Sequence, residues 1–337
     1  MKRFIILIVF VFIFVVFISC KKDDQSKEFT DVVNENTSYS LSGIMESFYP
    51  NGRKQNDFNV MYKSKNYIKV CLSNNDETKD VSQKQIILKN NDGVYILIPS
   101  INKNFKIQSS WPDGANYPYL LYSLVKDIKE NDNVLVTDND SYITYETSTC
   151  VFKNDNKYKE KIIVDKGTNL PVEVLIYDDN NELFIRVVFN EIKINVSLDE
   201  KEFVVDDTMN TWKDMYEEDF EFDGRVVEYP KVYPDGMKLV KESTEISDDG
   251  KELLSIMKFA NDEASFTLIE QYVNMTDNIS YQQEVGEVIN ILGNPSIMKT
   301  NSIITVYNGI EYTIASNSLS YDEMIDVLAS FMYEREK

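Results

Sequence analysis

The 337-residue chain contains no histidine, and this absence removes most of the familiar catalytic arrangements. A Ser-His-Asp triad, a Cys-His dyad and an HExxH zinc site all need an imidazole as a general base or ligand. Glycine is scarce, with 11 residues, and neither GxGxxG nor GxxxxGK occurs, so both common phosphate-binding loops are missing. The formal net charge of −21 argues against a nucleic-acid partner, because phosphate binding needs a basic surface.

Carboxylates are the remaining groups that could do chemistry. The segment Asp219–Gly224 has the acidic spacing of an EF-hand loop, but Pro230 stands at the twelfth position, where calcium needs a bidentate glutamate. The 56 acidic residues provide many pairs that could serve a carboxylate-only hydrolase, and their abundance makes each pair uninformative. We therefore expect no catalytic residue, no metal site and no cofactor, and we predict that the protein is not an enzyme.

The first twenty residues have the pattern of an export signal. A basic start is followed by an unbroken apolar run of 14 residues, 4–17. As a helix this run spans about 21 Å, which is short of a roughly 30 Å bilayer core and disfavours an uncleaved anchor. Residues 17–20, Phe-Ile-Ser-Cys, resemble the bacterial lipobox, in which the cysteine is lipidated and becomes the mature N-terminus. We predict a signal peptide over 1–19 and a palmitate-type diacylglyceryl anchor on Cys20.

Residues 20–27 then form a lipidated tether. The remaining chain is strongly acidic and is repelled by anionic headgroups, so the anchor must hold it at the bilayer. The predicted location is the cell membrane, on its extracytoplasmic face.

Two further cysteines, Cys71 and Cys150, belong to the mature chain. An exported protein could join them in a disulfide. The alternative is two thiols packed within separate strands.

The mature length is typical of two domains. Residues 28–205 alternate in hydrophobicity and carry hairpin turns, which predicts an antiparallel sheet interrupted by one amphipathic helix near 119–130. An acidic linker is expected over 206–224. Residues 225–337 are expected to form a small α+β domain with a hairpin at Asn308-Gly309 and a capping box at Ser320. A further helix is predicted from the apolar spacing of Val285, Val288, Ile289 and Leu292, ending at Gly293.

The strands of the first domain have one apolar face. A curved sheet with helices across its concave side can leave a cavity that suits an acyl chain. The alternative is an ordinary packed core, which periodicity alone favours because it does not reveal voids. The candidate cavity residues are Val60, Ile68, Val70 and Ile96.

This layout resembles the LolA-like lipoprotein-carrier superfamily: a lipobox, a short helix, and a long antiparallel meander interrupted by a helix at Tyr119–Glu130. The C-terminal part, with Tyr233–Gly236, Tyr307–Ile314 and Ser318–Ser320, is similar to that of Gram-positive (clostridial and bacillar) sporulation lipoproteins of the YdcC type. The germination lipoprotein GerS is a more distant relative. The resemblance implies an α+β fold: a β-rich curved half-barrel capped by helices, followed by a small α+β domain.

The resemblance also implies binding rather than catalysis, and only the lipidated cysteine carries over, onto Cys20. The first hypothesis is a membrane-anchored lipoprotein that binds a lipid, a lipoprotein or a protein partner at the cell envelope, in sporulation or germination. The alternative is a regulatory or structural protein without a small ligand, which restrains or activates a membrane or cell-wall partner. No nucleic-acid partner is expected.

Overall fold

The computed structural model describes residues 28–49, 52–74, 84–113, 117–151, 158–213, 226–246, 253–272, 279–332 and 334–335. The residues predicted to form a signal peptide and a lipidated tether, Cys20 included, lie outside the described residues, as does the segment 219–224 with its EF-hand-like spacing. No helix among the described residues is long and apolar enough to cross a membrane.

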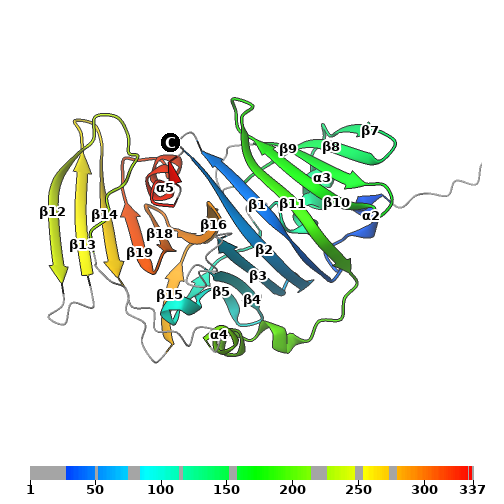
Figure 1. Cartoon of the computed structure of the whole chain (residues 1–337), viewed down its shortest axis with the longest axis horizontal. Coiled ribbons are helices and arrows are strands. Elements are labelled where there is room, and N and C mark those ends of the chain that lie inside the picture. Colours follow the sequence, from blue (N-terminus) through cyan, green and yellow to red (C-terminus); the bar gives the residue numbers. More distant parts are fainter. Residues whose placement is uncertain are drawn as a thin grey trace, which may run out of the picture.

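A 13-stranded, almost entirely antiparallel sheet forms the larger part of the molecule (Figure 1). Its strands lie in the order β15-β6-β5-β4-β3-β2-β1-β11-β10-β9-β8-β7, and β20 pairs with β2. The strand bounds are β1 Tyr39–Tyr49, β2 Gly52–Ser64, β3 Tyr67–Asn74, β4 Gln85–Asn90, β5 Gly93–Ile98, β6 Lys103–Gln108, β7 Leu135–Asp138, β8 Tyr142–Thr149, β9 Tyr158–Asp165, β10 Leu170–Tyr177, β11 Leu183–Ile194, β15 Ser280–Val285 and β20 Glu334–Arg335.

Helices cover both faces of this sheet. On the concave face, α2 (Phe29–Val32) and α3 (Leu121–Glu130) pack together and against β8 and β10. On the opposite face, η2 (Pro99–Ile101), η3 (Glu200–Phe203) and α4 (Val205–Lys213) lie near β3 to β6. The sheet is curved and does not close, which confirms the predicted β-rich half-barrel.

A second, seven-stranded sheet lies beside the first, in the order β12-β13-β14-β19-β18-β17-β16 (Figure 1, left). Helix α5 (Tyr321–Ala329) packs against β16, β18 and β19, and begins with the predicted capping box of Ser320 and Glu323. The strand bounds are β12 Lys238–Ile246, β13 Leu253–Ala260, β14 Ser265–Tyr272, β16 Glu287–Ile291, β17 Asn294–Met298, β18 Ser302–Tyr307 and β19 Ile310–Ala315.

The two sheets are interlocked through β15. This strand pairs in parallel with β6 at the edge of the large sheet, and only Gly286 separates it from β16 of the second sheet. The C-terminal third of the chain therefore contributes strands to both sheets.

Two segments differ from what the sequence predicts: the expected helix before Gly293 and the expected acidic linker. The helix expected around Val285–Leu292 is wrong: residues 287–291 and 294–298 form the β16–β17 hairpin, and Leu292 and Gly293 make its turn with φ of 50° and 80°. Strand β16 is covered on both faces, so its apolar run does not alternate and imitates a helical pattern. The expected acidic linker begins with α4, whose Met209 packs against the apolar outer face of β4 and β5.

Candidate functional site

The four candidate cavity residues all lie in the core of the large sheet. Val60 is on β2, Ile68 and Val70 are on β3, and Ile96 is on β5. Each is at most 1% exposed, and all four belong to one hydrophobic cluster that continues into the second sheet. All four side chains therefore lie on the inward face of the sheet.

Aromatic side chains fill the concave side above them. Tyr39 stacks on Tyr62 with ring centroids 4.7 Å apart, and Tyr62 contacts Tyr122 of α3 at 5.3 Å. Nearby, Phe58 contacts Tyr119, just before α3, at 5.7 Å. Such pairs bury large apolar surfaces and add about 0.5–1.5 kcal/mol each beyond area burial.

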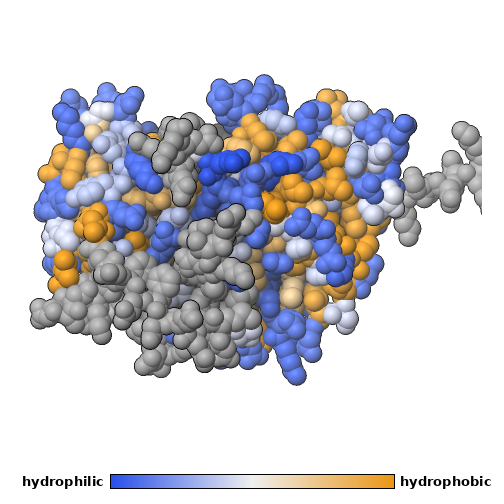
Figure 2. Space-filling model, in the orientation of Figure 1, coloured by the Kyte–Doolittle hydropathy of each residue, from blue (hydrophilic) through white to orange (hydrophobic). Residues whose placement is uncertain are grey.

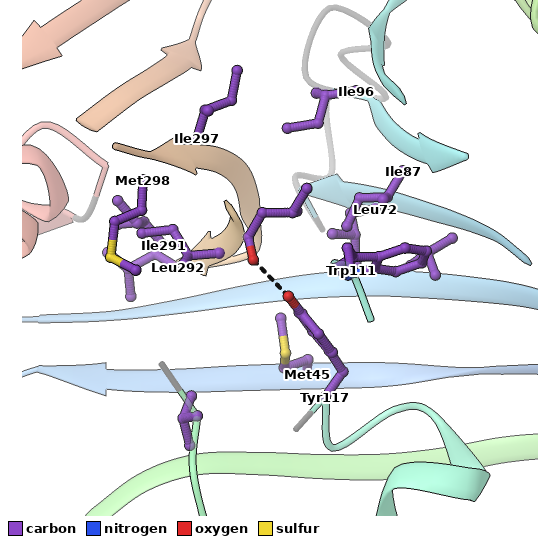
Figure 3. Close-up of a cluster of buried hydrophobic side chains, with 14 of the residues drawn as sticks. Met45, Leu72, Ile87, Ile96, Trp111, Tyr117, Ile291, Leu292, Ile297 and Met298 are labelled. Atoms are coloured by element: carbon purple, nitrogen blue, oxygen red, sulfur yellow. Dashed lines mark hydrogen bonds between the residues drawn. The ribbon is translucent and has the colours of Figure 1, made fainter. Parts of the chain in front are cut away.

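Between the two sheets the packing is equally dense. Figure 3 shows Trp111 and Tyr117 pointing into the space between the strands of the large sheet and the β16–β17 hairpin. The Tyr117 hydroxyl donates to the carbonyl oxygen of Val288 at 2.6 Å, and its ring meets Trp111 edge-on at 5.7 Å. The surrounding side chains are apolar and come from both sheets: Met45, Leu72, Ile87, Ile96, Ile291, Leu292, Ile297 and Met298.

The cavities that described residues line in this junction are small. Among the described residues, one cavity of about 20 Å³ lies beside Met45, Tyr119 and Leu292, and one of about 10 Å³ lies beside Ile96, Phe105 and Ile297. Each is large enough for about one water molecule. An acyl chain does not fit in either cavity without displacing core side chains.

Polar contacts also join the sheets. Lys103 of β6 forms an ion pair with Glu311 of β19, and both side chains are about nine-tenths buried. The Gln85 amide donates to the carbonyl oxygen of Val306 at 2.6 Å. Ser109 donates to the Glu287 carboxylate at 2.9 Å. Because these partners come from opposite sheets, the contacts hold the junction in one arrangement.

Gly293 of the β16–β17 turn lies close against Asn56 of β2 at this junction. Its φ of 80° lies in the left-handed region, and a Cβ there would overlap the Asn56 amide on β2. We expect Gly293→Ala to lower the free energy of unfolding by about 2–4 kcal/mol, from the left-handed backbone and the overlap together. Urea unfolding would measure this change. The control is Gly167→Ala, where a Cβ meets only the end of the Asp165 side chain; equal effects in both variants would contradict the close approach.

Cys71 and Cys150 are not joined in the structure. Cys71 is on β3 and Cys150 follows β8, and five strands separate β3 from β8 in the sheet order. Strand spacing of about 4.8 Å puts them far beyond the reach of a disulfide. The possible disulfide is therefore a wrong expectation. Burial raises the pKa of the Cys71 thiol to about 11, which makes it a poor nucleophile.

One buried pair of acids is not among the residues predicted from the sequence. Asp127 of α3 and Glu160 of β9 are 5% and 1% exposed, and Thr149 donates to Asp127 Oδ2 at 2.8 Å. Burial raises the pKa of both carboxyls, and their proximity raises that of Glu160 further. The alternation of β9 could have revealed Glu160, because it shares the inward face with Ile162 and Val164.

No group of three or more Cys, Asp or Glu residues within the described part of the chain could hold a metal ion. The Asp127–Glu160 pair lies beneath α3 and joins that helix to the sheet. We therefore interpret the pair as a contact that stabilises the packing of α3, and not as a metal or catalytic site.

The second sheet has an exposed edge. All nine residues of β12 are exposed, and within the part of the chain that the structure describes β12 pairs with a strand on one side only. Apolar side chains are exposed on β12 and on its neighbour β13, and Figure 2 shows such patches among polar atoms at this end of the molecule. They are Leu239, Val240, Ile246 and Ile256, which are 39–60% exposed.

Comparison with known proteins gives a family match. The model of the sporulation protein YdcC-like family matches residues 1–203. The sporulation protein YdcC of Bacillus subtilis (strain 168) is 28% identical over 316 residues, which cover 94% of this chain and 89% of that protein.

Two solved structures are similar at a lower level. The MucA/MucB complex of Pseudomonas aeruginosa aligns with 87% of this chain and 92% of that one, at 10% identity and a TM-score of 0.27. The LolA superfamily protein NE2245 from Nitrosomonas europaea aligns with 54% and 96%, at 11% identity and a TM-score of 0.30. Similarity at this level carries no argument about function.

Proposed function

Because the chain belongs to the YdcC-like family of sporulation proteins, we propose that it is a non-enzymatic, membrane-anchored lipoprotein that binds a protein partner at the cell envelope. The anchor is the diacylglyceryl group on Cys20, which the lipobox-like residues 17–20 support. It places the folded part on the extracytoplasmic face of the membrane.

The observation that carries this proposal is the filled concave face. A carrier of acyl chains needs an enclosed apolar space of several hundred Å³, whereas the two junction cavities measure about 20 and 10 Å³. Binding of a lipid or of a lipidated segment in the half-barrel is therefore disfavoured. A partner protein bound to the outer surface fits the structure better.

The surface that suits such a partner is the edge formed by β12. The outward N–H and C=O groups of an edge strand can pair with an extended segment, while flanking side chains provide specificity. The pairing of β12 with β13 shifts register between Leu239 and Lys241. This bulge and the lysines on the strand discourage unspecific pairing, which leaves the exposed apolar side chains for a matched partner.

Site-specific photocrosslinking in sporulating cells tests this function. A photoreactive residue in place of Ser243, on β12, is expected to give one discrete protein adduct. The same residue in place of Lys193, exposed on β11, is the control and should give none. The Ile256→Lys variant should weaken the Ser243 adduct, because it charges the neighbouring apolar surface. Equal adducts at both positions, or none at Ser243, would contradict the proposal.

A further inference from the structure

A groove of about 800 Å³ lies at the end of the large sheet formed by β8, β9 and β10, far from the β12 edge (Figure 1, right). One wall is formed by Glu130, the last residue of α3, and the three residues that follow it, and the opposite wall includes Asn181 in the β10–β11 turn. The volume is within the range of roughly 300–1,000 Å³ that is typical of small-molecule sites.

The lining of this groove is polar. Among the described residues that line it, Leu135 is the only aliphatic one and Tyr177 the only aromatic one. An acyl chain would leave most of the polar groups without partners, which is costly. The other lining residues carry amide, hydroxyl, carboxyl or ammonium groups: Glu130, Asn131, Asp132, Asn133, Glu146, Thr147, Ser148, Lys159, Glu160, Lys161 and Asn181.

The charges in the groove nearly balance. Lys161 pairs with Glu146 at 2.9 Å, and Lys159 bonds to the Asn181 amide oxygen. Burial, together with the neighbouring Asp127 carboxyl, raises the pKa of Glu160 and so favours its uncharged form. Two exposed acids, Glu130 and Asp132, remain. An anion such as a phosphate is therefore disfavoured, and a neutral ligand suits the lining.

Hydrogen bonds hold the wall in place. The Asn131 amide nitrogen donates to the carbonyl oxygens of Asp127 at 2.8 Å and Ser148 at 2.9 Å. The Ser148 hydroxyl donates back to Asn131 Oδ1 at 2.8 Å. The adjacent Asp132 and Asn133 are exposed. A wall fixed in this way presents its polar groups without an ordering cost on binding.

We propose that this groove binds a short neutral oligosaccharide. Sugar hydroxyls both donate and accept hydrogen bonds, which matches a lining of amides, hydroxyls and carboxyls. Tyr177 is half-buried and the Lys161 ammonium lies 6.0 Å from its ring centroid; we assign the C–H face of one sugar ring to the exposed part of this ring. This site is separate from the β12 edge, so the two proposals succeed or fail independently.

The test uses the full lipidated chain in detergent micelles and chitotetraose, a neutral oligomer of N-acetylglucosamine, as the probe. Isothermal titration calorimetry and saturation-transfer NMR on the sugar are expected to detect specific binding. Tyr177→Ala and Asp132→Lys should each weaken it by about tenfold, the equivalent of losing one good contact. Tyr233→Ala, a partly exposed tyrosine at the other end of the molecule, should leave the affinity unchanged.

Three results would overturn the proposal. The first is no signal above that of empty micelles at millimolar chitotetraose. The second is binding that neither groove variant weakens, since the site would then lie elsewhere. The third is tighter binding of the anionic oligomer tetragalacturonate, which would contradict the charge argument.

Discussion

Replacing Glu311 by alanine is expected to lower the free energy of unfolding by about 3–5 kcal/mol, because it leaves Lys103 as a buried charge without its partner. Lys103 lies between the sheets, where its ammonium group pairs with the Glu311 carboxylate and lies 4.8 Å from the centroid of the Phe105 ring. Water cannot replace the carboxylate without opening the junction. A shift of the urea midpoint at constant slope would measure the loss.

The matched control removes both charges. In Lys103→Met/Glu311→Leu, apolar groups of similar volume replace the pair, and such exchanges are often neutral or stabilising. We expect this double variant to be markedly more stable than Glu311→Ala. A single variant within about 0.5 kcal/mol of the wild type would show that the pair is solvated, as a surface pair is.

Glu160→Gln is expected to raise the stability of the protein in mildly alkaline buffer and to have little effect in acid. Unfolded carboxyls ionise near pH 4, whereas burial raises the pKa of Asp127 to about 7 and that of Glu160 well above its usual value. From about pH 4 up to the raised pKa values of the pair, the folded state binds more protons than the unfolded state. Its free energy of unfolding therefore falls as the pH rises, by about 1.4 kcal/mol per pH unit for each proton.

Glutamine retains the shape of Glu160 but does not ionise, so the variant loses this part of the pH dependence. Melting temperatures at about pH 5 and about pH 8 measure the difference. Glu191→Gln, an exposed substitution on β11, is the control and should give similar small changes at both values. If Glu160→Gln destabilises the protein more at the higher pH, the carboxyl is ionised in the folded state and the account of the pair is wrong.

Local patterns in the sequence predict much of the large sheet. Strand β1 alternates buried and half-buried side chains along most of its length, as a strand with one inward face should. The hairpin at Asn308-Gly309 lies where the sequence puts it, because both residues tolerate the positive φ, 50° and 75°, of a tight turn. The family resemblance to YdcC-type sporulation proteins is also confirmed.

Long-range pairing was not predictable in the same way. Nothing in residues 280–285 indicates that β15 leaves its neighbours to pair with β6, since pairing in parallel depends on contacts some 180 residues away in the chain. The sequence predicts a helix where the β16–β17 hairpin lies, again because of distant contacts. The large sheet and α5 cover both faces of this hairpin, and its own sequence does not reveal that cover. Tertiary context decides such segments.

The sequence predicts which way the candidate cavity residues point, but not whether they line an empty cavity. The inward direction of Val60, Ile68, Val70 and Ile96 follows from alternation, but whether they line a void or a packed core depends on what covers them. In the structure, Trp111 and Tyr117, which precede α3, pack over the sheet together with the β16–β17 hairpin. The surfaces proposed for binding, β12 and the polar groove, are recognised from exposure and shape, which a single sequence does not contain.

Native mass spectrometry shows whether the half-barrel is filled by its own side chains or holds a lipid. The protein would be produced without its anchor, from residue 24 onward, incubated with membrane lipids, and analysed both intact and by lipid extraction. The packed junction predicts the mass of the polypeptide alone and no lipid in the extract. A bound lipid of defined mass, displaced when a bulkier residue replaces Val60 or Val70, would contradict this packing and restore the lipid-carrier function.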